Sequence, residues 1–224
     1  MTYMPELSFA SKFFMLISSG SVVGYFFEAV PVTILVGLIY AIYRYCKIRK
    51  QHISVFLGLE IVKWLFVCYL TGLCYLLFAP REVLGEIYRY ILFGYVDWGA
   101  GSLADSLHFF TFDFNLVPTV FQWLNGEITI GTWVKTMIIG NLLMFVPMGV
   151  FLSLIFKKIN YRNIFKIAIL IPVVVEILQP VVGRSFDVDD IIMNFLGILI
   201  GYFMCFGVKL LIRSFCGTNR AQDI

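Results

Sequence analysis

The hydrophobic positions of this chain fall into five long runs. A helix needs about 20 mostly apolar residues to cross a bilayer, and the runs have this length: 22–43, 61–79, 136–156, 164–182 and 190–212. Strands of a membrane barrel would alternate apolar and polar residues, whereas a stretch such as 167–175 is apolar at every position. The pattern predicts an all-α fold, a polytopic helical membrane bundle with five transmembrane helices.

The composition excludes the main soluble classes. Hydrophobic residues make up 60% of the 224 residues and charged residues only 14%, whereas a soluble domain carries about 25% charged residues. A soluble globular enzyme is therefore excluded, and the high aromatic content of 17% excludes disorder. The net charge of +3 is too small to favour nucleic acid as a partner.

The basic residues predict the orientation in the membrane. Eleven of them fall on one side of a five-helix arrangement: Arg44, Lys47, Arg49, Lys50, Lys157, Lys158, Arg162, Lys166, Lys209, Arg213 and Arg220. Five fall on the other side: Lys12, Arg81, Arg89, Lys135 and Arg184. Lys63, at the start of the second run, can extend its side chain to the basic side. Because cytoplasmic loops carry the excess of Lys and Arg, we expect the N-terminus outside and the C-terminus in the cytoplasm.

This arrangement divides the chain into an N-terminal membrane segment with two helices, 1–80, a long extracytoplasmic loop, 81–135, and a cytoplasmic tail, 206–224. Within the loop, 83–96 is apolar and predicts an interfacial or re-entrant helix, with a short sixth span as the alternative. His108 stands alone there, so we expect it to pack at the membrane interface. The five cysteines lack the paired spacing of a zinc site and are expected to pack.

Polar residues inside the predicted spans indicate a functional site, because such residues are costly in lipid. At about 1.5 Å per residue, Asn141, Glu176, Gln179 and Asn194 all lie in the outer leaflet, and Glu28 has a comparable depth. Glu176 and Gln179 share one helix face. We therefore predict a polar pocket open to the outside, formed by Asn141, Glu176, Gln179, Arg184, Asp187, Asp190 and Asn194.

Small residues on the same helices predict close packing. Asp190, Asn194, Gly197 and Gly201 follow one stripe of a helix, and glycines at this spacing let a neighbouring helix approach. Pro147 and Gly149 are the corresponding candidates on the third span.

Each part of the predicted pocket has a structural alternative. The Asn, Glu and Gln side chains would then form a hydrogen-bond network that only holds three helices together. Arg184 would either pair with Asp187 to fix the turn or receive a phosphate or carboxylate. No cofactor is predicted, although oxygen atoms of Glu176, Asp187 and Asp190 are ligands that a divalent cation accepts.

The ordered segments Asn141-Leu-Leu-Met-Phe-Val-Pro-Met-Gly149, Glu176-Ile-Leu-Gln179, Arg184-Ser-Phe-Asp-Val-Asp-Asp190 and Asn194-Phe-Leu-Gly197 resemble the signature of the VanZ-like family. Asn115-Leu-Val-Pro118 resembles a shorter motif of the family upstream of that core, which would span 112–205. The resemblance implies a multi-pass protein of the bacterial cytoplasmic membrane. It also implies an association with resistance to the lipoglycopeptide teicoplanin.

Two functions compete on these grounds. In the first, the protein is a non-catalytic factor whose outer pocket engages a membrane lipid, a lipid-linked cell-wall precursor or a lipoglycopeptide. In the second, it is a membrane enzyme acting on a lipid-linked phosphate or amide, either with Glu176 as general base and Arg184 as anion clamp or by a metal-assisted mechanism. We favour binding, because no Ser, Cys or His stands beside an obvious base in the predicted pocket.

Overall fold

A computed structural model describes residues 22–51, 54–79, 87–88, 90–94, 110, 113–126, 131–156 and 161–220. Its described part contains five helices that are long and apolar enough to cross a membrane: Phe27–Gln51, Leu57–Phe78, Ile138–Ile155, Arg162–Val182 and Val188–Leu211. The prediction of an all-α membrane bundle with five spans is confirmed. The prediction for His108 lies outside the described residues, as does half of the segment 83–96, of which residues 87–88 and 90–93 are helical.

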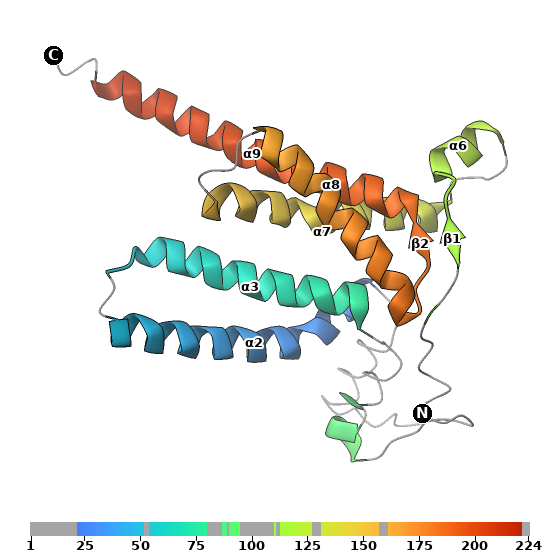
Figure 1. Cartoon of the computed structure of the whole chain (residues 1–224), viewed down its shortest axis with the longest axis horizontal. Helices are drawn as coiled ribbons and strands as arrows, with labels where there is room; N and C mark the ends of the chain where they lie inside the picture. Colours follow the sequence, from blue (N-terminus) through green and yellow to red (C-terminus); the bar gives the residue numbers. More distant parts are fainter. Residues whose placement is uncertain are drawn as a thin grey trace, which may run out of the picture. The chain divides into compact units, whose positions relative to one another are not determined.

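The elements follow one another along the chain as shown in Figure 1. They are α2 (Val22–Gln51), α3 (Leu57–Phe78), β1 (Phe114–Asn115), α6 (Thr119–Leu124), α7 (Thr132–Ile155), α8 (Tyr161–Leu178), the 3-10 helix η1 (Gln179–Val182), β2 (Phe186–Asp187) and α9 (Val188–Arg220).

Two helices extend further than their apolar runs. We expected the first span to end near 43, but α2 continues to Gln51 and carries Arg49 and Lys50 in its last turn. Likewise, α9 continues to Arg220, beyond the expected end at 212. Basic side chains interact favourably with the negative end of a helix, so the positive residues that close an apolar run do not need to end the helix.

The chain divides into two compact units. The first comprises Met1–Ile53, Val67–Thr111 and Gln179–Arg184, and the second comprises Ser54–Phe66, Phe112–Leu178 and Ser185–Ile224.

In the second unit, α7 and α9 pack together at the level of their backbones. A Cβ atom added to Gly149 of α7 would lie 2.6 Å from the backbone nitrogen of Tyr202 and would overlap the carbonyl oxygen of Ile198. On α9, a Cβ at Gly197 would overlap the carbonyl oxygen of Leu142, and one at Gly201 would overlap that of Val146. Because only glycine permits this approach, the three glycines fix the register of two parallel helices.

Larger side chains fill the space on either side of the glycine contacts. Phe145 of α7 and Ile198 of α9 have no exposed surface. Pro147 lies inside α7 and is half-buried. Further along, the Lys209 ammonium of α9 donates hydrogen bonds to the carbonyl oxygen of Ser153 at 2.6 Å and to its hydroxyl at 3.0 Å. This contact ties the last turn of α7 to the middle of α9.

In the first unit, α2 meets α3 where Gly72 faces Thr33, whose hydroxyl oxygen would lie 3.5 Å from a Cβ on the glycine. The hydroxyl of Tyr88 donates a hydrogen bond to the carbonyl oxygen of Glu28. Burial raises the pKa of Tyr88 above its ordinary value. The Glu28 side chain is itself buried in α2.

Candidate functional site

A short parallel pairing brings a distant segment to the start of α9. Phe114 and Asn115 of β1 align with Phe186 and Asp187 of β2, and the two strands lie side by side in Figure 1. The backbone N–H of Phe186 donates to the carbonyl oxygen of Asp113 at 2.9 Å. The pairing places residues 113–119 beside the first turn of α9, where the acidic side chains gather.

Asp187 caps the N-terminus of α9. Its Oδ1 accepts the backbone N–H of Asp189 at 2.8 Å, which is the bond that an Asp before the first turn makes with an otherwise unpaired helix N–H. Its Oδ2 accepts a hydrogen bond from the side-chain amide of Asn115 at 3.2 Å. Asp187 therefore joins β1 to α9 as well as starting the helix.

Glu176 connects α8 to the same place. Its side chain has no exposed surface, and its Oε2 accepts the backbone N–H of Asp187 at 3.1 Å. A buried carboxylate is costly unless it is hydrogen-bonded or paired, and this bond supplies part of the compensation. Glu176 thus lies at the junction where α8 ends and α9 begins.

Asp190 lies in the first turn of α9, and its side chain accepts a hydrogen bond from α7. The side-chain amide of Asn141 donates a hydrogen bond to Oδ1 of Asp190. Together with the glycine contacts, this bond defines one long face shared by the parallel helices α7 and α9. Two residues of the predicted pocket are therefore in direct contact.

Asp189 is a member of this site that the sequence analysis did not place in the pocket. It is 6% exposed, and its Oδ2 accepts hydrogen bonds from the backbone N–H of Thr119, at 2.8 Å, and from the Thr119 hydroxyl. Pro118 precedes α6 and makes no side-chain cap, so Asp189 supplies the acceptor that the first turn of α6 needs. The sequence offered only a weak signal, namely Pro118 just before a helix.

Asn194 lies one helical turn beyond Asp190 on α9. It is 1% exposed, and among the described residues its Oδ1 has no hydrogen-bond partner. Nearly all buried polar groups in proteins have a partner. An unpaired amide oxygen therefore marks a position where a donor group from outside the described residues would be stabilised.

The remaining predicted pocket residues, Gln179 and Arg184, belong to the first unit. Gln179 is 3% exposed and begins η1, and its carbonyl oxygen accepts the backbone N–H of Arg184 at 3.1 Å. The guanidinium Nη1 of Arg184 donates to the carbonyl oxygens of Leu76 at 2.9 Å and Leu77 at 3.0 Å. Neither role expected for Arg184 included this contact with the final turn of α3.

Within the described residues, no group of three His, Cys, Asp or Glu side chains is arranged to hold a metal ion. Glu176, Asp187 and Asp190 are each engaged by an N–H or amide donor of the chain itself. Among the described residues, Cys46, Cys68, Cys74 and Cys205 are free thiols that form no disulfide. The site is therefore best described as four carboxylates held by neutral donors, which we call the α9 polar cluster: Glu176, Asp187, Asp189 and Asp190.

Comparison with known proteins identifies the family. No curated protein and no solved structure matches the chain. A family model described as VanZ/LLP1 matches residues 66–212, which is more than half of the chain and contains the whole α9 polar cluster. The chain is a membrane protein that belongs to the VanZ/LLP1 family.

Proposed function

We propose that this protein is a non-catalytic factor of the bacterial cytoplasmic membrane. In this proposal the α9 polar cluster and Asn194 bind a polar group of an envelope lipid, a lipid-linked cell-wall precursor or a lipoglycopeptide. By doing so, the protein contributes to resistance of the teicoplanin type. Membership of the VanZ/LLP1 family supplies the envelope context.

One observation carries the binding proposal. Asn194 is almost fully buried and its amide oxygen has no partner among the described residues. A residue that served only to hold helices together would make its hydrogen bonds within the protein. Because Asn194 lies one turn from Asp190, a bound amide, hydroxyl or ammonium group would meet a carboxylate and an amide acceptor along one helix face.

The alternative function is an enzyme acting on a lipid-linked phosphate or amide. The observation that favours it is the Thr119 hydroxyl, which donates to the carboxylate of Asp189, as a nucleophile donates to its base. However, Asp189 also accepts the backbone N–H of Thr119. This second bond gives the pair a structural purpose, so we favour binding.

The test compares bacteria that carry wild-type protein, a deletion or single variants, with sensitivity to teicoplanin as the readout. Glu176→Gln and Asp190→Asn keep the side-chain shape and remove the charge. We expect both to resemble the deletion at normal membrane levels. Glu60→Gln is the matched control, because Glu60 of α3 pairs with Lys63 at 2.8 Å and takes no part in the cluster. Full resistance in both cluster variants would refute the proposal.

A further variant separates binding from catalysis. Thr119→Val removes the hydroxyl and keeps the backbone N–H that Asp189 accepts. Retained resistance supports a binding factor. Complete loss, with normal membrane levels and an unchanged unfolding temperature, supports the enzyme.

A further inference from the structure

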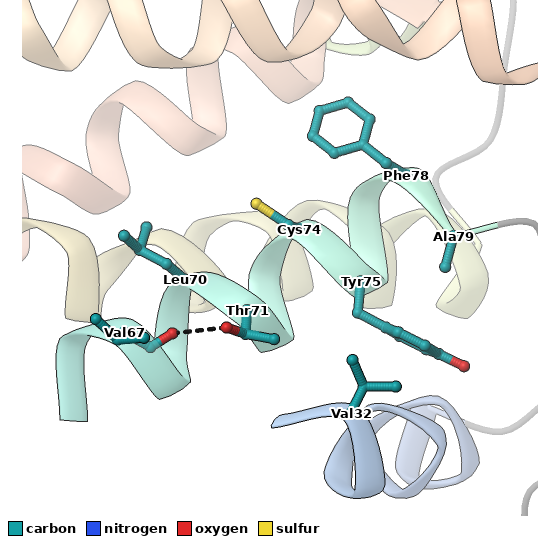
Figure 2. A pocket seen from close by; sticks show the side chains of 8 residues that line it. All are labelled: Val32, Val67, Leu70, Thr71, Cys74, Tyr75, Phe78 and Ala79. Atoms are coloured by element: carbon teal, nitrogen blue, oxygen red, sulfur yellow. Dashed lines mark hydrogen bonds between the residues drawn. The ribbon is translucent and has the colours of Figure 1, made fainter. Parts of the chain in front are cut away.

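The first unit contains a wide, open apolar cavity along α3 that the proposed function does not use. It has a volume of about 530 Å³ and is lined by Val32 of α2 and by residues between Val67 and Ala79 along α3. Ligand sites in proteins commonly measure about 300–1,000 Å³. Figure 2 shows Val32 lying beside the ring of Tyr75, with Leu70, Cys74 and Phe78 also projecting from α3.

The lining suits a hydrocarbon chain. The Thr71 hydroxyl donates to the carbonyl oxygen of Val67 at 2.9 Å (Figure 2), so this polar group is already satisfied within its own helix. The cavity runs along one candidate membrane span, Leu57–Phe78, and is lined by a single residue, Val32, of the other, Phe27–Gln51. Its surroundings in a bilayer are therefore lipid rather than water.

The length of the cavity matches one leaflet. At about 1.5 Å per residue, the stretch from Val67 to Ala79 covers about 18 Å along α3. Half of a hydrocarbon core of about 30 Å is about 15 Å. The cavity therefore extends from the end of α3, at the membrane surface, to about the bilayer midplane.

A positive charge is fixed at the surface end of this cavity. Arg184 is half-buried, and its Nη1 donates to the carbonyl oxygens of Leu76 and Leu77, within one turn of the cavity-lining Phe78 and Ala79. These bonds hold the guanidinium at the level where a lipid head group lies. A guanidinium matches the geometry and charge of a phosphate.

We propose that the first unit binds one phospholipid, with an acyl chain in the cavity along α3 and the lipid phosphate at Arg184. The apolar cavity suits the acyl chain of the lipid, and the Arg184 guanidinium suits its phosphate. The proposal goes beyond the α9 polar cluster and does not depend on its function.

Native mass spectrometry of the full chain tests the proposal by titration with three lipids of the same acyl composition: phosphatidylglycerol, phosphatidylethanolamine and diacylglycerol. We expect one tightly retained phospholipid. Diacylglycerol should bind about tenfold more weakly, because it lacks the group that would accept charged hydrogen bonds. Arg184→Gln should remove most of this difference. Equal retention of all three lipids by the wild-type protein would overturn the assignment of the phosphate to Arg184.

A second pair of variants tests the cavity itself, since Arg184→Gln also removes bonds to the end of α3. Val32→Trp places an indole in the cavity, and Ile39→Trp makes the same change at a 58% exposed position of α2 that does not line it. We expect Val32→Trp to lose the retained lipid and Ile39→Trp to keep it. Equal lipid retention in both variants would overturn the site. A wild-type dimer that becomes a monomer in Val32→Trp would also overturn it, because the cavity would then be occupied by a second copy of the chain.

The outcome can be distinguished from that of the proposed function. Lipid retention by Val32→Trp tests this site, whereas teicoplanin sensitivity of Glu176→Gln and Asp190→Asn tests the proposed function, so either proposal can fail while the other holds.

Discussion

The side-chain amide of Asn141 donates a hydrogen bond to the carboxylate of Asp190, which links α7 to the first turn of α9. Asn141 must be the donor of this bond, because an ionised carboxylate such as that of Asp190 can only accept hydrogen bonds. It lies on the helix face that continues through the contacts of Gly197 and Gly201 with α7. The pair therefore joins the α9 polar cluster to the most tightly packed part of the second unit.

This relationship predicts the outcome of a side-chain exchange. Asn141→Asp would place two carboxylates against each other, and we expect it to lower the free energy of unfolding by about 1–3 kcal/mol. The double variant Asn141→Asp with Asp190→Asn restores a donor and an acceptor and should recover most of the loss. Thermal unfolding in detergent measures both effects. A double variant no more stable than Asn141→Asp would show that the bond does not form.

The glycine contacts predict that the effect of a Gly→Ala substitution on stability depends strongly on its position within α7. Gly149→Ala should lower the free energy of unfolding by about 1–3 kcal/mol, because its Cβ would overlap the backbone of α9. Gly140→Ala on the same helix meets nothing within 4 Å and should instead stabilise α7 by about 0.5–1 kcal/mol. Unfolding temperatures of the two variants provide the comparison. Equal effects would contradict the close approach of α7 and α9.

The orientation in the membrane is a prediction that fusion proteins can check. Eleven basic residues against five place the C-terminus in the cytoplasm and the segment before α7 outside. Alkaline phosphatase is active only after export, so a fusion after Ile224 should be inactive and a fusion at Gly126 active. The opposite pattern of activities would reverse the topology.

Much of the fold could be predicted from the sequence because lipid imposes a simple requirement. A span must be apolar over a fixed length, and this requirement located all five helices from hydropathy alone. Helical spacing also put Asp190, Gly197 and Gly201 on one stripe, and that stripe faces α7 in the structure.

Other parts of the site could not be predicted, because they depend on contacts that leave no pattern in the sequence. The pairing of β1 with β2 involves two residues on each side, too few for any periodicity, and it is this pairing that brings Thr119 to Asp189. Arg184 contacts the backbone carbonyl groups of Leu76 and Leu77. Every residue has such a group, so no residue type in α3 could indicate the partner of Arg184.

We propose that the polar positions around the start of α9 bind a ligand in addition to holding the fold, and Asn194 tests this proposal most directly. Asn194→Leu keeps the approximate size of the side chain and removes a buried amide oxygen that has no partner among the described residues. Because an unsatisfied buried acceptor costs about 1–3 kcal/mol, the variant should unfold at a higher temperature than wild type.

The deciding measurement is teicoplanin sensitivity of the same variant, with Asn163→Leu at an exposed position of α8 as the matched control. We expect Asn194→Leu to behave like the deletion although the protein is more stable and reaches normal membrane levels, and Asn163→Leu to behave like wild type. Wild-type resistance in a stabilised Asn194→Leu protein would show that Asn194 binds no ligand required for resistance.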